Sequence, residues 1–254
     1  MPTNQITVPN SQIRPPEDFF LPAGYIQQDA AHSRDKGLGD GEYWTDERIE
    51  SSRVYQFHVY RWAAELIQAR SLASVLDVGS GTGIKLRDHI TPVCNDIEGF
   101  DQPAGVRAAQ RLETPGVHTA VDLEQPDIQP HRTFDLIISA DVIEHMLDPD
   151  PMLELIKSFC DEQTLVLLST PDRARLHGRD CMASTKPEHV REWAADEFVA
   201  YLKDRGFEIE AQHFFPADDT PIETNADQEA AFKLANASLS PHRCHTVLCK
   251  PKRG

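Results

Sequence analysis

Short apolar runs alternate with amphipathic segments over most of the chain. Strand-like runs lie at 75–78, 97–100, 117–121, 134–139, 164–169, 207–212 and 246–249. Between them, apolar positions recur every three or four residues, as on one face of a helix, at 84–90, 103–112, 149–159 and 194–205. Strands that alternate with helices predict an α/β fold built on a doubly wound, mostly parallel sheet.

The first 44 residues follow neither pattern. Five prolines and a glycine-rich stretch at 35–41 interrupt any periodicity, so the segment 1–44 is predicted to be an irregular N-terminal arm. A single domain is expected over 45–254. It carries an insertion at about 218–243, with a short helix near 227–236, which we expect to form a lid or a dimer contact.

A helix is predicted between the arm and the first strand. Thr45 is a suitable N-cap, and two acidic residues in the next turn favour the positive end of a helix. The apolar face that follows has spacings of 4, 3 and 4, and consists of Tyr55, Val59, Trp62 and Leu66. This pattern predicts one amphipathic helix that runs to about Arg70.

Charge and cysteine usage narrow the class of protein. The chain has 25 Lys and Arg against 41 Asp and Glu, a net charge of −16, which argues against a nucleic-acid partner because phosphate contacts need a basic surface. Five cysteines without a CxxC pair indicate reduced, intracellular usage. No secretory signal is recognisable, and the longest apolar run, near 165–168, is too short to span a membrane. A cytoplasmic protein is expected.

A glycine-rich loop follows the first predicted strand. Gly79, Gly81 and Gly83 lie between that strand and a helix, where free N–H groups and glycine backbone suit a close-lying ligand. The dinucleotide fingerprint would need a glycine at position 84, which is Ile84. A triphosphate-binding P-loop would end in Gly-Lys-Ser or Gly-Lys-Thr, and Lys85 is not flanked in this way. The ligand is therefore expected to be neither a dinucleotide nor a triphosphate.

Four sequence blocks resemble the Rossmann-like S-adenosylmethionine-dependent methyltransferases, in particular their small-molecule branch. The blocks are VLDVGSGTG at 75–83, GFD at 99–101, VDLE at 121–124 and FDLIISADVIEHMLDP at 134–149. The resemblance covers about residues 50–213 and the final strand. It implies a seven-stranded sheet with helices on both faces and an antiparallel last strand. It also implies S-adenosylmethionine as the cofactor.

The resemblance assigns cofactor contacts to residues at the carboxyl ends of the strands. Asp101 is expected to accept the ribose hydroxyls, since a carboxylate takes two such donors. Asp122, with the Leu123 backbone beside it, is expected at the adenine amino group. Asp77 is expected to hold the methionine amino end through the loop, or to organise the glycine turn. The loop contacts themselves fall on Gly79, Ser80, Gly81 and Gly83.

The block after the fourth strand lies at the edge of the sheet where ligands of open α/β sheets bind. Asp141 is expected to line the methionine end of the cofactor or the point of methyl transfer. Two roles are open for His145, which stands beside Glu144. An imidazole titrates near neutrality and suits a general base, or it hydrogen-bonds the loop and has a structural role.

Acceptor specificity is expected from the variable segments. The first holds the candidates Tyr43, Trp44, Arg53 and Tyr55. Burial of Tyr43 and Trp44 against the domain is the alternative to a role in covering a ligand. The second, 173–193, contains KPEHVREW at 186–193, which is similar to a stretch in methyltransferases of sugars, lipid-linked and polyketide-type metabolites. It supplies His189, a further catalytic candidate, and Arg191. An exposed loop followed by a helix start is the alternative interpretation of this stretch.

No metal site is predicted. Four potential ligands gather near the end of the chain: His242, Cys244, His245 and Cys249. At least one lies in a predicted strand, where alternate side chains point to opposite faces, so the four are not expected to converge on a zinc ion.

The sequence therefore predicts an S-adenosylmethionine-dependent methyltransferase that acts by in-line displacement on a small-molecule, carbohydrate- or lipid-linked acceptor. The protein's main tasks in such a transfer are alignment and exclusion of water. A protein or RNA methyltransferase and a non-catalytic cofactor-binding member of the fold are the alternatives. A homodimer is expected as a possible assembly.

Overall fold

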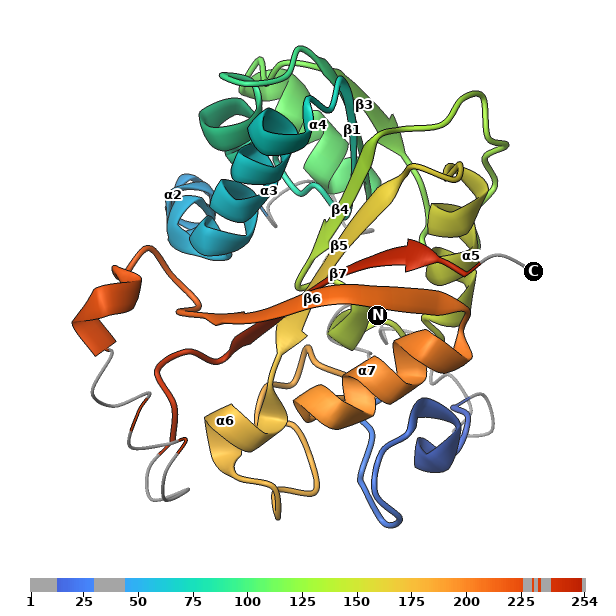
Figure 1. The fold of residues 1–254 in the computed structure, drawn as a ribbon, viewed down its shortest axis with the longest axis vertical. Coiled ribbons are helices and arrows are strands. Elements are labelled where there is room, and N and C mark those ends of the chain that lie inside the picture. The colour runs from blue at the N-terminus through green and yellow to red at the C-terminus, as the bar shows by residue number, and fades with distance from the viewer. Residues whose placement is uncertain (1–12, 30–43, 226–229, 231–232, 234–238, 253–254) are drawn as a thin grey trace, which may run out of the picture.

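A seven-stranded sheet forms the centre of the protein, as the computed structural model shows for residues 13–29, 44–225, 230, 233 and 239–252 (Figure 1). The strands are β1 (Ser74–Val78), β2 (Asp96–Asp101), β3 (Val117–Ala120), β4 (Leu136–Ala140), β5 (Leu165–Pro171), β6 (Phe207–Phe215) and β7 (Cys244–Pro251). Their order is β3-β2-β1-β4-β5-β7-β6. β1 to β5 pair in parallel, whereas β7 is antiparallel to both β5 and β6. The predicted doubly wound α/β fold is confirmed.

Helices cover both faces of the sheet (Figure 1). The α-helices are α2 (Asp46–Val54), α3 (Phe57–Arg70), α4 (Pro103–Arg111), α5 (Asp150–Ser158), α6 (Arg173–His177) and α7 (Ala195–Asp204). Short 3-10 turns lie at η2 (Pro16–Phe19), η4 (Ile143–His145) and η5 (Ile222–Asn225), and a π-helical turn, η3 (Leu86–Ile90), follows the glycine loop. No helix in the described part of the chain is both long and apolar enough to cross a membrane.

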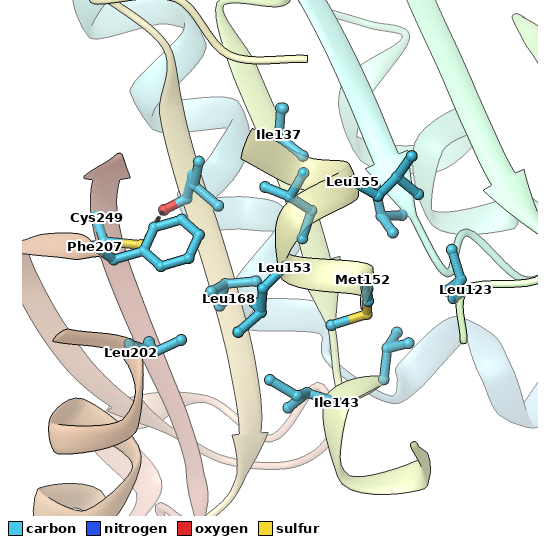
Figure 2. Close-up of a cluster of buried hydrophobic side chains, with 14 of the residues drawn as sticks. Leu123, Ile137, Ile143, Met152, Leu153, Leu155, Leu168, Leu202, Phe207 and Cys249 are labelled. Carbon is cyan, nitrogen blue, oxygen red and sulfur yellow. Dashed lines mark hydrogen bonds between the residues drawn. The ribbon is translucent and has the colours of Figure 1, made fainter. Parts of the chain in front are cut away.

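Each face of the sheet has its own hydrophobic cluster. On one face, β4 and β5 pack against α5 and α7 through side chains that include Ile137, Leu168, Leu153 and Leu202 (Figure 2). On the other face, α3 and η3 pack against the alternate residues of the same strands. Every residue of β4 and β5 is buried, which is expected for central strands covered on both sides.

The predicted helix from Thr45 to Arg70 is wrong in one respect. Thr45 caps α2 as predicted, because its hydroxyl accepts the N–H of Arg48. The helix is then interrupted at Tyr55 and Gln56, and Gln56 adopts a left-handed backbone with φ +54. Tyr55 therefore lies half exposed and not on the apolar face. The apolar spacing did not predict this interruption, because the 4, 3, 4 spacing continues across it.

Smaller differences concern the ends of elements. The structure adds the short helix α6, which no apolar pattern predicted, and capping there comes from Asp172, whose carboxylate accepts the N–H of Arg175. α5 begins at Asp150, one residue later than predicted, with Pro149 as its N-cap, and the carboxylate of Asp148 accepts the N–H of Asp150. The predicted helix near 227–236 falls mostly outside the described residues.

The described part of the N-terminal arm, 13–29, packs against the domain. Phe19 and Tyr25 are buried in the cluster that α5 and α7 share. The indole nitrogen of Trp193 donates to the carbonyl of Phe19 at 2.8 Å. The segment is irregular apart from η2, and its aromatic side chains complete one of the two cores.

Candidate functional site

The glycine loop turns sharply at the carboxyl end of β1. The N–H groups of Gly79 and Ser80 both donate to the carbonyl of Phe100 on β2, at 2.7 and 3.0 Å. Gly79 has φ +87, and a Cβ at this position would lie 2.3 Å from a methyl group of Val142. Only glycine fits there, because any side chain would be both strained and blocked. The loop is thereby packed directly against the segment that follows β4.

Asp101 lies at the end of β2 beside the glycine loop. Its two carboxylate oxygens accept the N–H of Gly81 at 2.7 Å and of Gln102 at 2.8 Å. Burial raises the pKa of Asp101 to about 6, although these two hydrogen bonds act in the opposite direction. Each oxygen takes one hydrogen bond and retains room for a second, which suits a pair of hydroxyl donors.

Asp77 is fully buried behind the loop, and the partly buried Lys85 acts on it as a nearby opposite charge. Asp77 accepts the hydroxyl hydrogen of Tyr60 at 2.8 Å, and burial raises the pKa of this aspartate to about 7. The ammonium group of Lys85 lies 5.2 Å from the ring centre of Tyr60, and it donates to Gln56 Oε1 at 2.7 Å. Burial lowers the pKa of Lys85, while the nearby carboxylates act to raise it.

Several buried polar atoms around the loop have no hydrogen-bond partner among the residues that the structure describes. They are Asp77 Oδ1, Ser80 Oγ and Thr82 Oγ1. Unpaired buried polar atoms are rare in folded proteins and often mark a site that a ligand completes. A carboxylate oxygen and a lysine ammonium behind a glycine turn are complementary to the amino and carboxylate groups of a methionine moiety. Residues 77–85 together with Asp101, hereafter the cofactor edge, therefore fit S-adenosylmethionine.

The predicted adenine contacts lie on the loop after β3. Asp122 is exposed, and its carboxylate accepts the N–H of Glu124 at 3.0 Å. Leu123 is buried in the core. Glu124 in turn accepts the backbone N–H of Leu147, which joins this loop to the loop after β4. The role of Asp122 at an adenine stays a prediction.

Asp141 is held in an unusual conformation at the end of β4. Its backbone is left-handed, with φ +52. Its carboxylate accepts the hydroxyl of Ser169 at 2.5 Å and the amide of Gln56 at 3.0 Å. The thiol of Cys244 lies 3.7 Å from the same carboxylate. This conformation costs a non-glycine residue energy, which the contacts that hold Asp141 must offset.

Three side chains converge beyond Asp141, and we call them the acceptor cluster: Glu144, His145 and His189. One donor atom of each lies within 4.8 Å of the others, and the two imidazole rings meet edge to face at 4.8 Å. Glu144 and His189 are buried, whereas the side chain of His145 is 31% exposed. The Glu144 carbonyl accepts the N–H of Val190 at 2.8 Å, which holds segment 186–193 beside the loop after β4.

Hydrogen bonds fix the orientation of both imidazoles in the acceptor cluster. Nδ1 of His145 donates to the carbonyl of Glu188 at 2.8 Å, since a carbonyl can only accept. Nδ1 of His189 lies 2.6 Å from a carboxylate oxygen of Glu192. The carboxylate of Glu192 also accepts the hydroxyl of Ser184. Within the described residues, Nε2 of each ring has no hydrogen-bond partner.

The charge states of the acceptor cluster follow from burial. Burial and the neighbouring His189 lower the pKa of His145 to about 4, so this imidazole is unprotonated at neutral pH. Burial and the Asp141 charge raise the pKa of Glu144 well above its usual range. Burial would raise the pKa of Glu192, but the contacts with His189 outweigh it and the pKa is lowered.

Arg191 is fully buried behind the acceptor cluster. Its guanidinium donates to the carbonyls of Met146 and Leu147 at 2.9 and 2.7 Å, and to the side chain of Gln27 at 2.6 Å. It also stacks 3.8 Å from the ring centre of Phe19. Arg191 was predicted to contact the substrate, whereas these contacts clamp the loop after β4 to the N-terminal segment.

The remaining predicted acceptor contacts are dispersed. Trp44 approaches the glycine loop, since a Cβ on Gly81 would lie 3.3 Å from its ring. Arg53 forms ion pairs with Glu50 and Asp88 on the surface. Tyr55 is exposed, and Tyr43 lies outside the described residues. The structure therefore brings Trp44 to the cofactor edge and leaves Arg53 and Tyr55 on α2 and just after it.

The four residues weighed for zinc are not brought together. Cys244 lies in the cluster on the α3 face of the sheet, and Cys249 lies in the cluster on the opposite face. The thiol of Cys249 donates to the carbonyl of Val166 in the core. His245 stacks on the ring of Phe214. Alternation along β7 separates these side chains as expected.

Several residues that connect the cofactor edge to Asp141 and β5 were not predicted from the sequence. They form a hydrogen-bonded chain from the glycine-loop helix to β5: Lys85, Gln56 and Ser169, with Tyr60 beside it. A lysine in the first turn after a glycine loop was the one available signal. Gln56 and Ser169 belong to no sequence motif. Their positions beside Asp141 depend on how α3 and β5 pack around it.

Comparisons with known proteins agree with this geometry. Residues 52–212 match the family described as methyltransferase domain. The chain is 29% identical over 179 residues to a probable S-adenosylmethionine-dependent methyltransferase of Mycolicibacterium smegmatis, covering 68% of this chain and 63% of that protein. It is 26% identical over 151 residues to a ubiquinone biosynthesis O-methyltransferase of Bradyrhizobium diazoefficiens, covering 54% of this chain. The match thus spans about three fifths of these relatives' length, 59% in the second case.

Solved structures share the fold at low sequence identity. An S-adenosylmethionine-dependent methyltransferase from Clostridium acetobutylicum superposes with a TM-score of 0.56 at 13% identity, covering 82% of this chain and 96% of that one. A plantazolicin methyltransferase in complex with SAH gives a TM-score of 0.52 at 16% identity, covering 78% and 83%. At this level the similarity shows the fold alone.

Proposed function

The chain belongs to the methyltransferase domain family, and we propose that it transfers the methyl group of S-adenosylmethionine to a hydroxyl oxygen of a small organic molecule. Two of the relatives described above support this assignment by name, one as an S-adenosylmethionine-dependent methyltransferase and one as an O-methyltransferase. Oxygen is proposed as the methyl-accepting atom because of the acceptor cluster, where Nε2 of His145 and Nε2 of His189 lack a hydrogen-bond partner within the described residues.

The cofactor edge is proposed to bind and orient the cofactor. Asp101 accepts the ribose hydroxyls, and the loop at Gly79 and Gly81 lets the backbone approach without a Cβ in the way. Asp77 and Lys85 supply opposite charges for the amino and carboxylate groups of the methionine moiety. Trp44 beside Gly81 covers this edge from the N-terminal side.

Asp141 is proposed to stand between cofactor and acceptor. Its carboxylate is held by Ser169 and Gln56 in one orientation, and its strained backbone keeps it at the end of β4. A fixed negative charge there favours a sulfonium over a neutral thioether, because charge interactions are strong where water is excluded. Asp141 therefore helps to bind the charged cofactor and to release the neutral product.

His145 is proposed to receive the proton of the acceptor hydroxyl. Its pKa of about 4 leaves Nε2 unprotonated at neutral pH, and Nδ1 is fixed by the Glu188 carbonyl. When bound, S-adenosylmethionine supplies a methyl group whose S–C bond breaks as an oxygen electron pair forms the new O–C bond. The hydroxyl proton passes to Nε2 of His145. A hydroxyl needs such a proton acceptor, whereas a stronger nucleophile would not.

A methyl-transfer assay tests this function. The purified protein is incubated with methyl-labelled S-adenosylmethionine and three acceptor pools: hydroxylated aromatic compounds, sugars and sugar-linked lipids, and total protein with RNA. We expect label in a small hydroxylated compound as an acid-stable methyl ether. The variant Asp101→Ala should lose both cofactor binding and transfer, whereas Arg53→Ala on the surface should retain both.

Three results would contradict the proposal. Label confined to protein or RNA would identify a macromolecular acceptor. Label on nitrogen or carbon would contradict the choice of a hydroxyl oxygen as the acceptor atom. Binding of S-adenosylhomocysteine without transfer to any pool would favour a non-catalytic member of the family.

A further inference from the structure

The acceptor cluster has the composition of a transition-metal site, although no metal site was expected from the sequence. Glu144, His145 and His189 offer one oxygen and two nitrogen donors within 4.8 Å of one another. Residues adjacent in sequence supply two of them, and the third comes from the segment before α7. A set of two imidazoles and one carboxylate is typical of catalytic zinc and related sites that keep an open coordination position.

Both imidazoles are oriented as metal ligands usually are. Each uses Nδ1 for a hydrogen bond, His145 to the Glu188 carbonyl and His189 to the Glu192 carboxylate. Each Nε2 is left with its lone pair directed away from that bond. Metal-bound histidines nearly always donate their other nitrogen to a carbonyl or a carboxylate in this way. Glu192 is itself held by Ser184, and the N–H of Glu192 donates to Tyr25.

The carboxylate of Glu144 is placed to complete the set. Its side chain is 1% exposed, and Oε1 lies 3.9 Å from Nε2 of His145. The other oxygen accepts the hydroxyl of Thr170 at 3.2 Å. Each contact of Glu144 thus involves a neutral group or an imidazole. Full burial of a carboxylate without a paired cation is costly, and a metal ion at this point would supply the missing charge.

We propose that Glu144, His145 and His189 bind one divalent cation of the zinc class, and that the acceptor oxygen occupies its open position. Two nitrogen ligands and one oxygen favour Zn²⁺ or Co²⁺ over Mg²⁺ and Ca²⁺, which select oxygen ligands. The exposed side of His145 gives the ion and the acceptor an entry path. Zinc–ligand distances of about 2.0–2.2 Å require the three donors to move closer by roughly 1 Å.

The surrounding charges favour a cation. The Asp141 and Glu192 carboxylates lie near the cluster, and Lys186 is the opposing positive charge that acts on both Glu144 and His145. Lys186 is exposed, so its side chain is free to turn toward solvent when a cation binds. The N–H of Val190 and that of Arg191 both donate to the Glu144 carbonyl, which holds the two ligand segments together.

The choice of acceptor rests on the proposed function, whereas the binding of the cation does not. With the cation present, His145 is a ligand and no longer takes the proton. The coordinated hydroxyl releases its proton to solvent, and the oxygen keeps the electron pair that forms the bond to the methyl carbon. A bound cation favours this loss because it stabilises the resulting negative oxygen.

Metal titration of the whole protein tests the proposal. Protein without a histidine tag is stripped with a chelator and titrated with Co²⁺ and Zn²⁺, followed by visible absorption and calorimetry, with Mg²⁺ as a comparison. We expect one equivalent of Co²⁺ with an absorption band of a four- or five-coordinate site. His145→Ala, His189→Ala and Glu144→Gln should each weaken Co²⁺ binding by at least about tenfold.

A matched histidine variant controls for unspecific binding. His131→Ala removes a surface imidazole that contacts Glu98, and Co²⁺ affinity should stay within about twofold of wild type. S-adenosylhomocysteine affinity and urea unfolding report whether each ligand variant still folds. Glu192→Gln leaves all three ligands in place and should weaken Co²⁺ binding by about tenfold or more, because it removes the partner that orients His189.

The outcomes separate this inference from the proposed function. No Co²⁺ or Zn²⁺ binding in the micromolar range, or equal binding by the ligand variants, would overturn the metal site. If metal-free protein nonetheless methylates a hydroxyl, the proposed function stands with His145 as proton acceptor. If the metal binds at the cluster but no hydroxyl compound is methylated, the metal site stands and the proposed function falls.

Discussion

The cofactor edge and the acceptor cluster are built in different ways, although both lie at the same end of the sheet. The cofactor edge is local in sequence: the turn at Gly79 and Gly81 follows β1 directly, and Asp101 comes from the adjacent strand. The acceptor cluster joins His145 to His189 across a long interval of sequence. Its segments are held together by Arg191 and by the Glu144 carbonyl.

This difference indicates how each part tolerates change. The cofactor edge depends on backbone geometry that few residues can adopt, so single substitutions within it should act on cofactor binding. The acceptor cluster depends on buried polar clamps outside it, so substitutions away from the cluster should remove it while the cofactor edge remains.

Arg191→Met should separate the two parts most clearly. The substitution leaves the carbonyls of Met146 and Leu147 and the side chain of Gln27 without their donor in a buried setting. The free energy of unfolding should fall by about 3 kcal/mol or more, measured by urea denaturation. Below the transition, affinity for S-adenosylhomocysteine should stay within about threefold. A parallel loss of cofactor affinity would show that the two parts are not independent.

Gly79→Ala tests the point where the two parts touch. The new methyl group would meet Val142 and would require φ +87 of an alanine, so unfolding free energy should fall by about 3 kcal/mol and cofactor affinity should fall with it. Gly206→Ala is the matched control, because Gly206 has φ +82 with nothing near its Cβ position. It should cost only about 1–2 kcal/mol. Equal losses in the two variants would mean that the contact with Val142 is unimportant.

Asp101→Asn should act mainly on cofactor binding. An amide keeps one acceptor oxygen but places an NH2 group against the N–H of Gly81 or Gln102, where the carboxylate accepted. Calorimetry with S-adenosylhomocysteine should show a loss of about tenfold to a hundredfold. Asp122→Asn should cost less, because an amide oxygen still accepts from an amino group. A larger loss in the second variant would reverse the assignment of the two residues.

Asp77→Asn should change the pH dependence of stability. The pKa of about 7 lies above the ordinary value of 3.8, so the folded protein holds this proton more tightly than the unfolded chain does. Wild-type unfolding free energy should therefore fall as pH rises from about 4 to 7, by about 1–2 kcal/mol between pH 5.5 and 7. The variant should show a flatter profile in urea titrations across this range. Asp180→Asn on the surface should keep the wild-type slope.

The same contrast explains what the sequence could predict. The glycine loop, Asp77 and Asp101 follow from a short motif at the end of a strand, and the fold follows from the alternation of apolar runs. The break at Gln56 was not predictable, because its left-handed backbone is held by tertiary contacts with Lys85 and Asp141.

Predictions for the acceptor side were less complete for the same physical reason. His145 and His189 were both recognised as candidates, but no pattern indicated that they lie together with Glu144. Arg191 was expected at the substrate because segment 186–193 is similar to a stretch in methyltransferases of sugars and lipid-linked metabolites, and an exposed loop was the alternative. Its complete burial depends on Phe19 and Gln27, which come from the other end of the sequence.

The place of β7 has a consequence for how the protein is made. β7 lies between β5 and β6. The edges of β5 and β6 that pair with it therefore stay open during synthesis until residues 244–251 have left the ribosome. An open apolar edge such as that of β5 is prone to pair with other chains. Nascent chains are therefore expected to need protection by chaperones until residues 244–251 have emerged, and ribosomes stalled shortly before residue 244 should display an aggregation-prone intermediate.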